Sequence, residues 1–194
     1  SSAASGLTTV DGLNMFGNYD IYGGSVLAQN MSGIDGSTST LTARTGNMII
    51  IEDYLEAGAG NDILDEVKTG FATLAGDMER RSEMLDTDIG IAGAAGGWEF
   101  SQADLSGFTQ IGDSLIIGDR SNTAGTADVF VNALDLSGES YGIGFAGRSV
   151  TFNGDVQSGR DLELDANTFN FNGNDLYAKR DIALSPIETS RDIG

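Results

Sequence analysis

The chain contains no cysteine and no histidine. Without cysteine it can form neither disulfides nor thiolate metal sites. Without histidine it cannot build imidazole metal sites or any mechanism that needs a histidine base. These absences disfavour an enzyme, and we expect neither catalytic residues nor a bound cofactor.

Basic residues are also scarce. Ten Lys and Arg stand against 29 Asp and Glu, for a formal net charge of -19. Such a surface repels the phosphates of nucleic acids and anionic membranes, so we expect no nucleic-acid partner. An acidic coat of this kind binds calcium at most weakly and nonspecifically.

Long hydrophobic runs are missing as well. The uncharged segment from Ile89 to Trp98 is rich in Gly and Ala and is too short to cross a bilayer. The chain begins Ser-Ser-Ala-Ala-Ser without Met, which fits a processed, secreted form or an excised fragment. We expect no transmembrane segment.

Glycine, in contrast, is abundant, with 28 residues against a single proline. This composition favours tight turns between many short strands. Residues 1–60 show such strands, with TSTLTA and NMIIIEDYL among them, and form the predicted N-terminal β-rich segment. The continuous run Met48–Ile51 predicts a strand that is buried on both faces.

The hydrophobic period changes after residue 60. Six apolar residues recur at helical spacing and predict an amphipathic helix over roughly 61–85: Ile63, Val67, Phe71, Leu74, Met78 and Leu85. We expect this helix, within a segment 61–87, to dock on a sheet or a second subunit through Phe71, Leu74 and Met78. A Gly/Ala-rich connector, 88–97, follows it.

Residues 98–194 repeat a pattern of strand and turn. FNGDVQSGRDLELDA at 152–166 returns as FNGNDLYAKRDIALS at 171–185. Aligned by eye, Ala146–Phe152, Ser158–Leu164 and Ala178–Leu184 share a small residue, then Arg, then two apolar residues separated by one. The alternation predicts columns of inward side chains: Val150, Phe152, Leu162, Leu164, Phe169, Phe171, Ile182 and Leu184. Thr151, Glu163, Asn170 and Ala183 would face outward, and Asn153, Asn172 and Asn174 suit corners.

These phrases resemble the repeats of filamentous haemagglutinin-type adhesins. SGRDLELDA, AKRDIAL and ARTGNMII carry the resemblance, which covers mainly 98–194 with a fainter copy at 25–56. It implies a mainly β protein, a right-handed parallel β-helix, here with one inserted amphipathic helix. It also implies an extracellular or cell-surface structural role. The spacing of the strands fits an antiparallel β-sandwich or jelly roll equally well.

One phrase resembles a calcium-binding repeat. Ala57–Asp65 nearly matches the nonapeptide of calcium-binding β-rolls, with Asn61, Asp62 and Asp65 as the ligand candidates. Such rolls need several adjacent copies, and this chain has one. Capping of the following helix by Asn61 or Asp62 explains the phrase better.

The last residues begin the repeat again and stop inside it. Arg191, Asp192 and Ile193 restart the motif, which leaves the final coil open. We therefore expect a structural subunit that polymerises head to tail or forms part of an adhesin stalk, with these three residues at the interface. The alternatives are a surface module that binds a host or a glycan, and a calcium-dependent polysaccharide-active β-helix enzyme.

Overall fold

The computed structural model describes residues 6–12, 18–29, 40–52, 71–82, 86–108, 110–121 and 126–187. The chain divides into two compact units. Unit 1 comprises Ser1–Glu83 with Gly107–Ser114, and unit 2 comprises Met84–Ser106 with Leu115–Gly194. In the described residues both units are mainly β, as expected from the composition.

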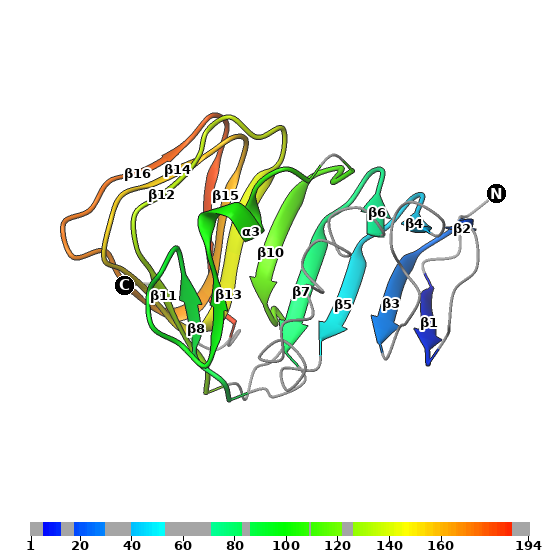
Figure 1. Cartoon of the computed structure of the whole chain (residues 1–194), viewed down its shortest axis with the longest axis horizontal. Coiled ribbons are helices and arrows are strands. Elements are labelled where there is room, and N and C mark those ends of the chain that lie inside the picture. Colours follow the sequence, from blue (N-terminus) through cyan, green and yellow to red (C-terminus); the bar gives the residue numbers. More distant parts are fainter. Residues whose placement is uncertain are drawn as a thin grey trace. The chain divides into compact units, whose positions relative to one another are not determined.

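Unit 1 alternates between two parallel sheets. Its strands are β1 (Leu7–Asp11), β2 (Asn18–Ile21), β3 (Ser25–Gln29), β4 (Thr40–Ala43), β5 (Met48–Glu52), β6 (Phe71–Thr73) and β7 (Met78–Ser82). Odd-numbered strands lie side by side in the order β1-β3-β5-β7, and even-numbered strands in the order β2-β4-β6 (Figure 1). All the registers determined within these two groups are parallel.

The odd strands of unit 1 bury every second residue. Val26 pairs with Met48, which pairs with Met78, and all three are fully buried. Ala28, Ile50 and Arg80 form the next inward column, in which the arginine is also fully buried. In β5 the residues between them, Ile49 and Ile51, are only half-buried, so the prediction that both faces of this strand are buried was wrong.

The predicted helix over 61–85 is wrong where the structure describes it. Phe71 begins strand β6, Met78 begins strand β7, and the exposed Leu74 lies in the bend between them. The helical spacing arises because inward positions on two consecutive strands are separated by a short bend. Met48 pairs with Met78 across 30 residues, a contact that local periodicity does not register. Residues 61–70 and 83–85 lie outside the described residues.

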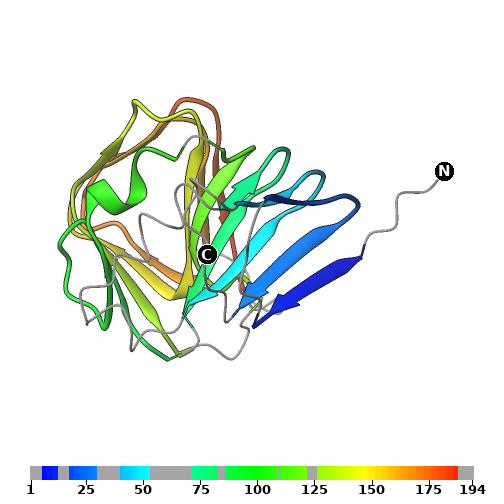
Figure 2. The same ribbon diagram turned by 45° about the vertical axis from the view of Figure 1, so that its right-hand side comes forward.

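Unit 2 contains ten strands and one short helix among its described residues. These are β8 (Ile89–Ile91), β9 (Trp98–Phe100), α3 (Gln102–Leu105), β10 (Ser114–Gly118, which joins the unit from Leu115), β11 (Asp128–Val131), β12 (Leu134–Leu136), β13 (Gly142–Phe152), β14 (Val156–Ser158), β15 (Leu162–Asn170), β16 (Leu176–Ala178) and β17 (Ile182–Ser185). Strand β8 lies within the segment predicted as a connector. Strands β12, β14 and β16 form one sheet, while β15 lies between β13 and β17 in another (Figure 2).

The repeated phrase stacks on itself. Val156 pairs with Leu176, and Leu162 and Leu164 pair with Ile182 and Leu184, each 20 residues later. The predicted corner is confirmed at Asn172, whose backbone has the left-handed φ of 52°. Asn174, the residue inserted in the second phrase, donates side-chain hydrogen bonds to the carbonyls of Phe152 and Phe171 at 2.8 and 3.1 Å.

The third phrase does not align as predicted. Strands β13 and β15 run together over two legs, Ile143–Gly147 beside Leu162–Ala166 and Ser149–Thr151 beside Thr168–Asn170. Arg148 falls at the break between the legs. Phe145, not Phe152, is therefore the partner of Leu164, and Val150 is the partner of Phe169.

The inward columns are filled where a strand has neighbours on both sides. Val150, Phe152, Leu162 and Leu164 are at most 1% exposed, as predicted. Phe169 is half-buried, while Phe171, Ile182 and Leu184 at the last strand positions are exposed. Every strand register determined in the described residues is parallel, so the antiparallel sandwich is wrong for this part of the chain.

Membrane insertion through a helix finds no candidate in the described part of the chain. The search of those residues gave no helix of the length and hydropathy that a bilayer span requires.

Candidate assembly surface

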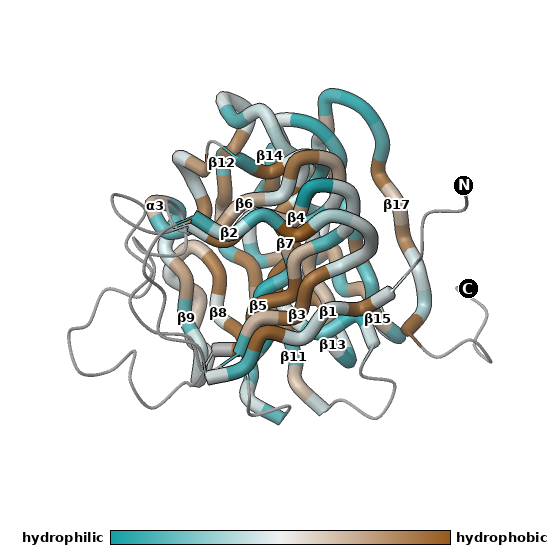
Figure 3. Tube along the Cα trace, turned by 90° about the vertical axis from the view of Figure 1, so that its right-hand side faces the viewer, coloured by the Kyte–Doolittle hydropathy of each residue, from teal (hydrophilic) through white to brown (hydrophobic). Residues whose placement is uncertain are grey.

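Two edge strands carry exposed apolar side chains. Strand β17 pairs only with β15, and its four residues are all exposed, with Ile182 at 43% and Leu184 at 38%. Strand β1 pairs only with β3 and is exposed along most of its length. Hydrophobic segments are visible along β17 in Figure 3. Unpaired strand edges of this kind template the addition of another strand.

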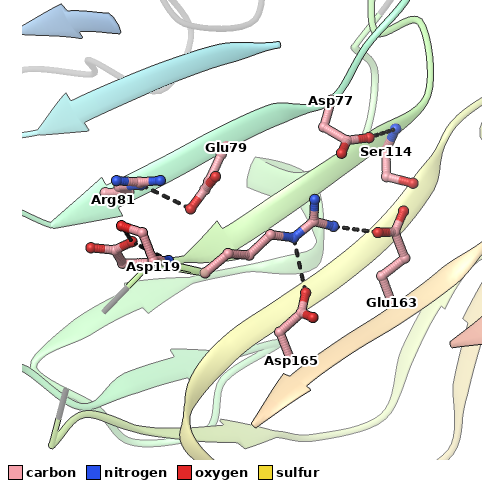
Figure 4. A network of polar contacts seen from close by, with 9 residues as sticks. Asp77, Glu79, Arg81, Ser114, Asp119, Glu163 and Asp165 are labelled. Atoms are coloured by element: carbon pink, nitrogen blue, oxygen red, sulfur yellow. Dashed lines mark hydrogen bonds and ion pairs between the residues drawn. The ribbon is translucent and has the colours of Figure 1, made fainter. Parts of the chain in front are cut away.

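A ladder of side chains precedes the odd strands of unit 1. The Asn47 N–H donates to Ser25 Oγ at 3.2 Å, and the Asp77 N–H donates to Asn47 Oδ1 at 3.1 Å. The Ser114 N–H then donates to Asp77 Oδ1 at 3.1 Å (Figure 4). Each side-chain oxygen thus accepts the N–H of the register-equivalent residue one strand further on. We call these positions rungs.

Unit 2 repeats the rungs with aspartates. The Asp181 N–H donates to Asp161 Oδ1 at 3.2 Å, just before β17 and β15. The Asp175 N–H donates to Asp155 Oδ1 at 2.9 Å, just before β16 and β14. A carboxylate accepts such a bond more strongly than a neutral group does, and it satisfies a donor at the strand entrance. Asp181 and Asp175 are the last rungs of the described residues.

Glycines stand beside the rungs of unit 1. A Cβ on Gly24 would lie 1.9 Å from the Gly6 carbonyl oxygen, and one on Gly46 would lie 2.3 Å from the Gly24 carbonyl oxygen. Gly76 has the same relation to the Gly46 carbonyl, at 2.7 Å. The strands can approach at this corner only because these residues lack a side chain. Gly6, the first of the column, has nothing within 4 Å of its Cβ position.

An arginine binds the outer face of β15. Arg120 forms ion pairs with Glu163 and Asp165, which Figure 4 shows projecting from the same strand. The bond from Arg120 Nε to Asp165 Oδ2 is 2.9 Å. The three side chains are between 19 and 26% exposed, so this cluster is partly shielded from solvent. The guanidinium relieves the repulsion between two neighbouring carboxylates.

A second arginine holds Asp128 at the entrance of β11. Arg148 donates from Nε to Asp128 Oδ1 at 2.9 Å, and Ser149 Oγ donates to the same oxygen at 2.8 Å. Burial of Asp128 acts to raise its pKa, but these hydrogen bonds and the charge of Arg148 lower it more, so the pKa lies below its ordinary value. The bond and the charge of Asp128 raise the pKa of Arg148.

The arginines Arg148, Arg160 and Arg180 do not form one ladder. Arg160 and Arg180 are stacked, since the Arg180 N–H donates to the Arg160 carbonyl at 3.0 Å. Both guanidinium groups lie near Asp161, at 3.4 and 3.5 Å. Arg148 belongs to the other leg of its strand and binds Asp128 instead, so the sequence alignment misplaced it.

The predicted interface residues divide into three groups. Phe71 and Met78 are 5% and 0% exposed, so they belong to the core of unit 1 and no partner can contact them. Leu74 is 47% exposed and stays a predicted interface residue. Two sets of candidates lie outside the described residues: the assembly residues Arg191, Asp192 and Ile193, and the calcium candidates Asn61, Asp62 and Asp65.

No alternative ligand site competes with these surfaces in the described residues. No group of three or more Asp and Glu residues is placed there to hold a metal ion. The carboxylates described above are instead engaged with arginines or with main-chain N–H groups.

The rungs were missed by the sequence analysis. Their residue types differ in unit 1, where Ser25, Asn47 and Asp77 share only a side-chain oxygen. The available signal was position: each precedes the first inward residue of a strand. Comparison with known proteins adds no relative to this picture, since no family model, curated protein or solved structure matches the chain.

Proposed function

We propose that this chain is a non-enzymatic structural subunit of an extracellular or cell-surface assembly, which adds copies head to tail on a right-handed parallel β-helix. The observation that carries the proposal is the pair of exposed edge strands, β1 and β17, each with one side lacking a neighbour in the described residues. A solenoid that stands alone ends in a cap that covers such edges.

The alternation of strands supports the β-helix. In unit 1 the chain passes from one parallel sheet to the other and back, strand by strand, and in unit 2 it does the same from β12 to β17. Every second strand then returns beside its predecessor after about 20 residues, as a coil of a solenoid does. A right-handed winding is the form that the resemblance to haemagglutinin-type repeats implies.

The side chains support a structural role over a catalytic one. The partly shielded carboxylates Glu163 and Asp165 are held by Arg120, which leaves them poorly suited to act as an acid and a base. Repeated inward columns and rungs contribute to stacking, and stacking is what a stalk or filament needs.

Assembly is tested by sedimentation velocity and negative-stain electron microscopy across a concentration series. We expect oligomers that grow with concentration and appear as rods, with a cross-β spacing of about 4.8 Å along the rod in fibre diffraction. A chain that stays monomeric at every concentration would contradict the proposal. Release of unsaturated uronides from acidic polysaccharides would instead support the enzyme.

A further inference from the structure

We propose that strand β17 pairs in parallel with strand β1 of a second copy, with Ile182 beside Thr8, Leu184 beside Val10 and Asp181 as the rung for Leu7. This inference rests on the proposed function and specifies the surfaces that meet. It requires that each edge present the main-chain groups, side-chain columns and steric space that the other needs.

The main-chain groups of the two edges are complementary. Leu162 donates its N–H to the Asp181 carbonyl at 2.9 Å, so the Asp181 carbonyl faces β15. Alternate residues of a parallel strand bond to opposite neighbours, so the N–H and carbonyl of Ile182 face away from β15. By the same rule Leu7 faces away from β3, because Ser25 donates to the Gly6 carbonyl at 3.0 Å. Ile182 can therefore donate to the Leu7 carbonyl of the second copy.

The last rung selects this register. Asp181 carries the carboxylate that follows Asp161 in the ladder, and no N–H of the described residues occupies it. Leu7 stands at the position of Ser25 on the neighbouring strand, where the N–H is directed toward the preceding strand. Pairing Ile182 with Thr8 brings that N–H to Asp181, as Ser25 receives Asn47 within unit 1.

The exposed columns are also continued. Thr8 and Val10 are the inward residues of β1, because their register partners Val26 and Ala28 are fully buried. Leu184 would then pack on Val10 and Ile182 on the Thr8 methyl group. Burial of two large side chains that are now about two-fifths exposed favours the pairing, at about 25 cal/mol for each Å² of apolar surface removed from water.

Gly6 provides an independent observation. Gly24, Gly46 and Gly76 are required because each lies against the carbonyl of the preceding glycine, whereas the Cβ position of Gly6 is open and its φ is not in the left-handed region. The described structure thus gives no reason for a glycine at this position. In the proposed register Gly6 lies over the carbonyl of Arg180, and the same close approach then requires glycine.

The pairing is tested by disulfide cross-linking, since the chain has no cysteine of its own. Ala183→Cys and Thr9→Cys are made in separate chains and mixed under mild oxidation. Opposed residues of neighbouring strands are about 4.8 Å apart, within reach of a disulfide. We expect a mixed dimer in at least about tenfold excess over the product from Ala183→Cys with Gly138→Cys, whose cysteine lies in an exposed turn.

A second pair of variants reports on the steric argument. Gly6→Val should leave the circular dichroism and the unfolding midpoint unchanged and reduce assembly at least about tenfold. Gly138→Val, also with open space around its Cβ position, should change neither. Assembly that ignores Gly6→Val and gives no preferred mixed disulfide would place another segment against β17 and overturn the pairing, while the proposed assembly stands. A wild-type chain that never associates would overturn both.

Discussion

The replacement of one leucine column by alanine tests the stacking directly. Leu164 and Leu184 are register partners in β15 and β17, and both face inward. Leu164 lies between Phe145 and Leu184 and is 1% exposed, whereas Leu184 has a neighbour on one side and is 38% exposed. The same mutation therefore probes the same column with and without a covering strand.

The expected losses differ by at least a factor of about two. Leu164→Ala leaves a cavity among packed side chains and should lower the free energy of unfolding by about 2–5 kcal/mol. Leu184 buries about three-fifths of a side chain whose full burial contributes roughly 1.5–3 kcal/mol, so Leu184→Ala should cost about 1–2 kcal/mol without a cavity.

Urea denaturation followed by far-ultraviolet circular dichroism measures both losses, at a concentration where the chain is monomeric. Leu164→Val and Leu184→Val give a milder matched pair in case Leu164→Ala does not fold. Equal losses at the two positions would refute the assignment of β17 as an uncovered edge. In assembling conditions the loss for Leu184→Ala should grow toward that for Leu164→Ala, because a second copy would cover the side chain.

Two further changes test the corner and the ion pair. Gly46→Ala places a Cβ 2.3 Å from the Gly24 carbonyl oxygen and should lower the free energy of unfolding by about 1–3 kcal/mol, whereas Gly138→Ala meets nothing within 4 Å and should be near neutral in the same urea titration. The Asp128 pKa is lower in the folded chain than in the unfolded one, so its carboxylate contributes stability above about pH 4, and this contribution is lost as the pH falls through the folded pKa. Asp128→Asn should therefore flatten the acid side of a stability profile measured from about pH 2 to 6, and an unchanged slope would contradict the role of Arg148.

The repeated phrase allowed the register of the last strands to be predicted. Its apolar pairs at Leu162 and Leu164 and at Ile182 and Leu184 alternate in the same way, so one register keeps both pairs inward. The extra Asn174 did not disturb this because it is absorbed in a corner, where its side chain binds two carbonyls. Repetition carried long-range information that a single copy lacks.

The helix was predicted wrongly for the opposite reason. Phe71 and Met78 occur once, without a second copy of their segment to compare, and their spacing of seven fits two helical turns as well as two strands joined by a bend. The deciding contacts are with Leu41 and Met48, at separations of 30 residues. Nothing in the local pattern reports such partners.

The candidate surface was predictable in part. An open end was expected from the interrupted motif at Arg191–Ile193, which lies outside the described residues, and the exposed strands that we describe are β1 and β17. The rungs were invisible because Ser, Asn and Asp can all serve, at intervals of 22 to 37 residues in unit 1. Their role appears only when successive strands are placed side by side.

The rungs also explain part of the acidic composition. Asp155, Asp161, Asp175 and Asp181 all stand at strand entrances, and Asp155 and Asp161 each accept an N–H from the next strand. Stacked carboxylates repel one another, yet each accepted N–H and the nearby guanidinium groups of Arg160 and Arg180 offset that repulsion. An arriving strand would offer the same compensation to Asp181. The charge that would make two copies repel at a distance is thus, at this rung, the group that binds them on contact, and added salt should favour association by screening the first effect more than the second.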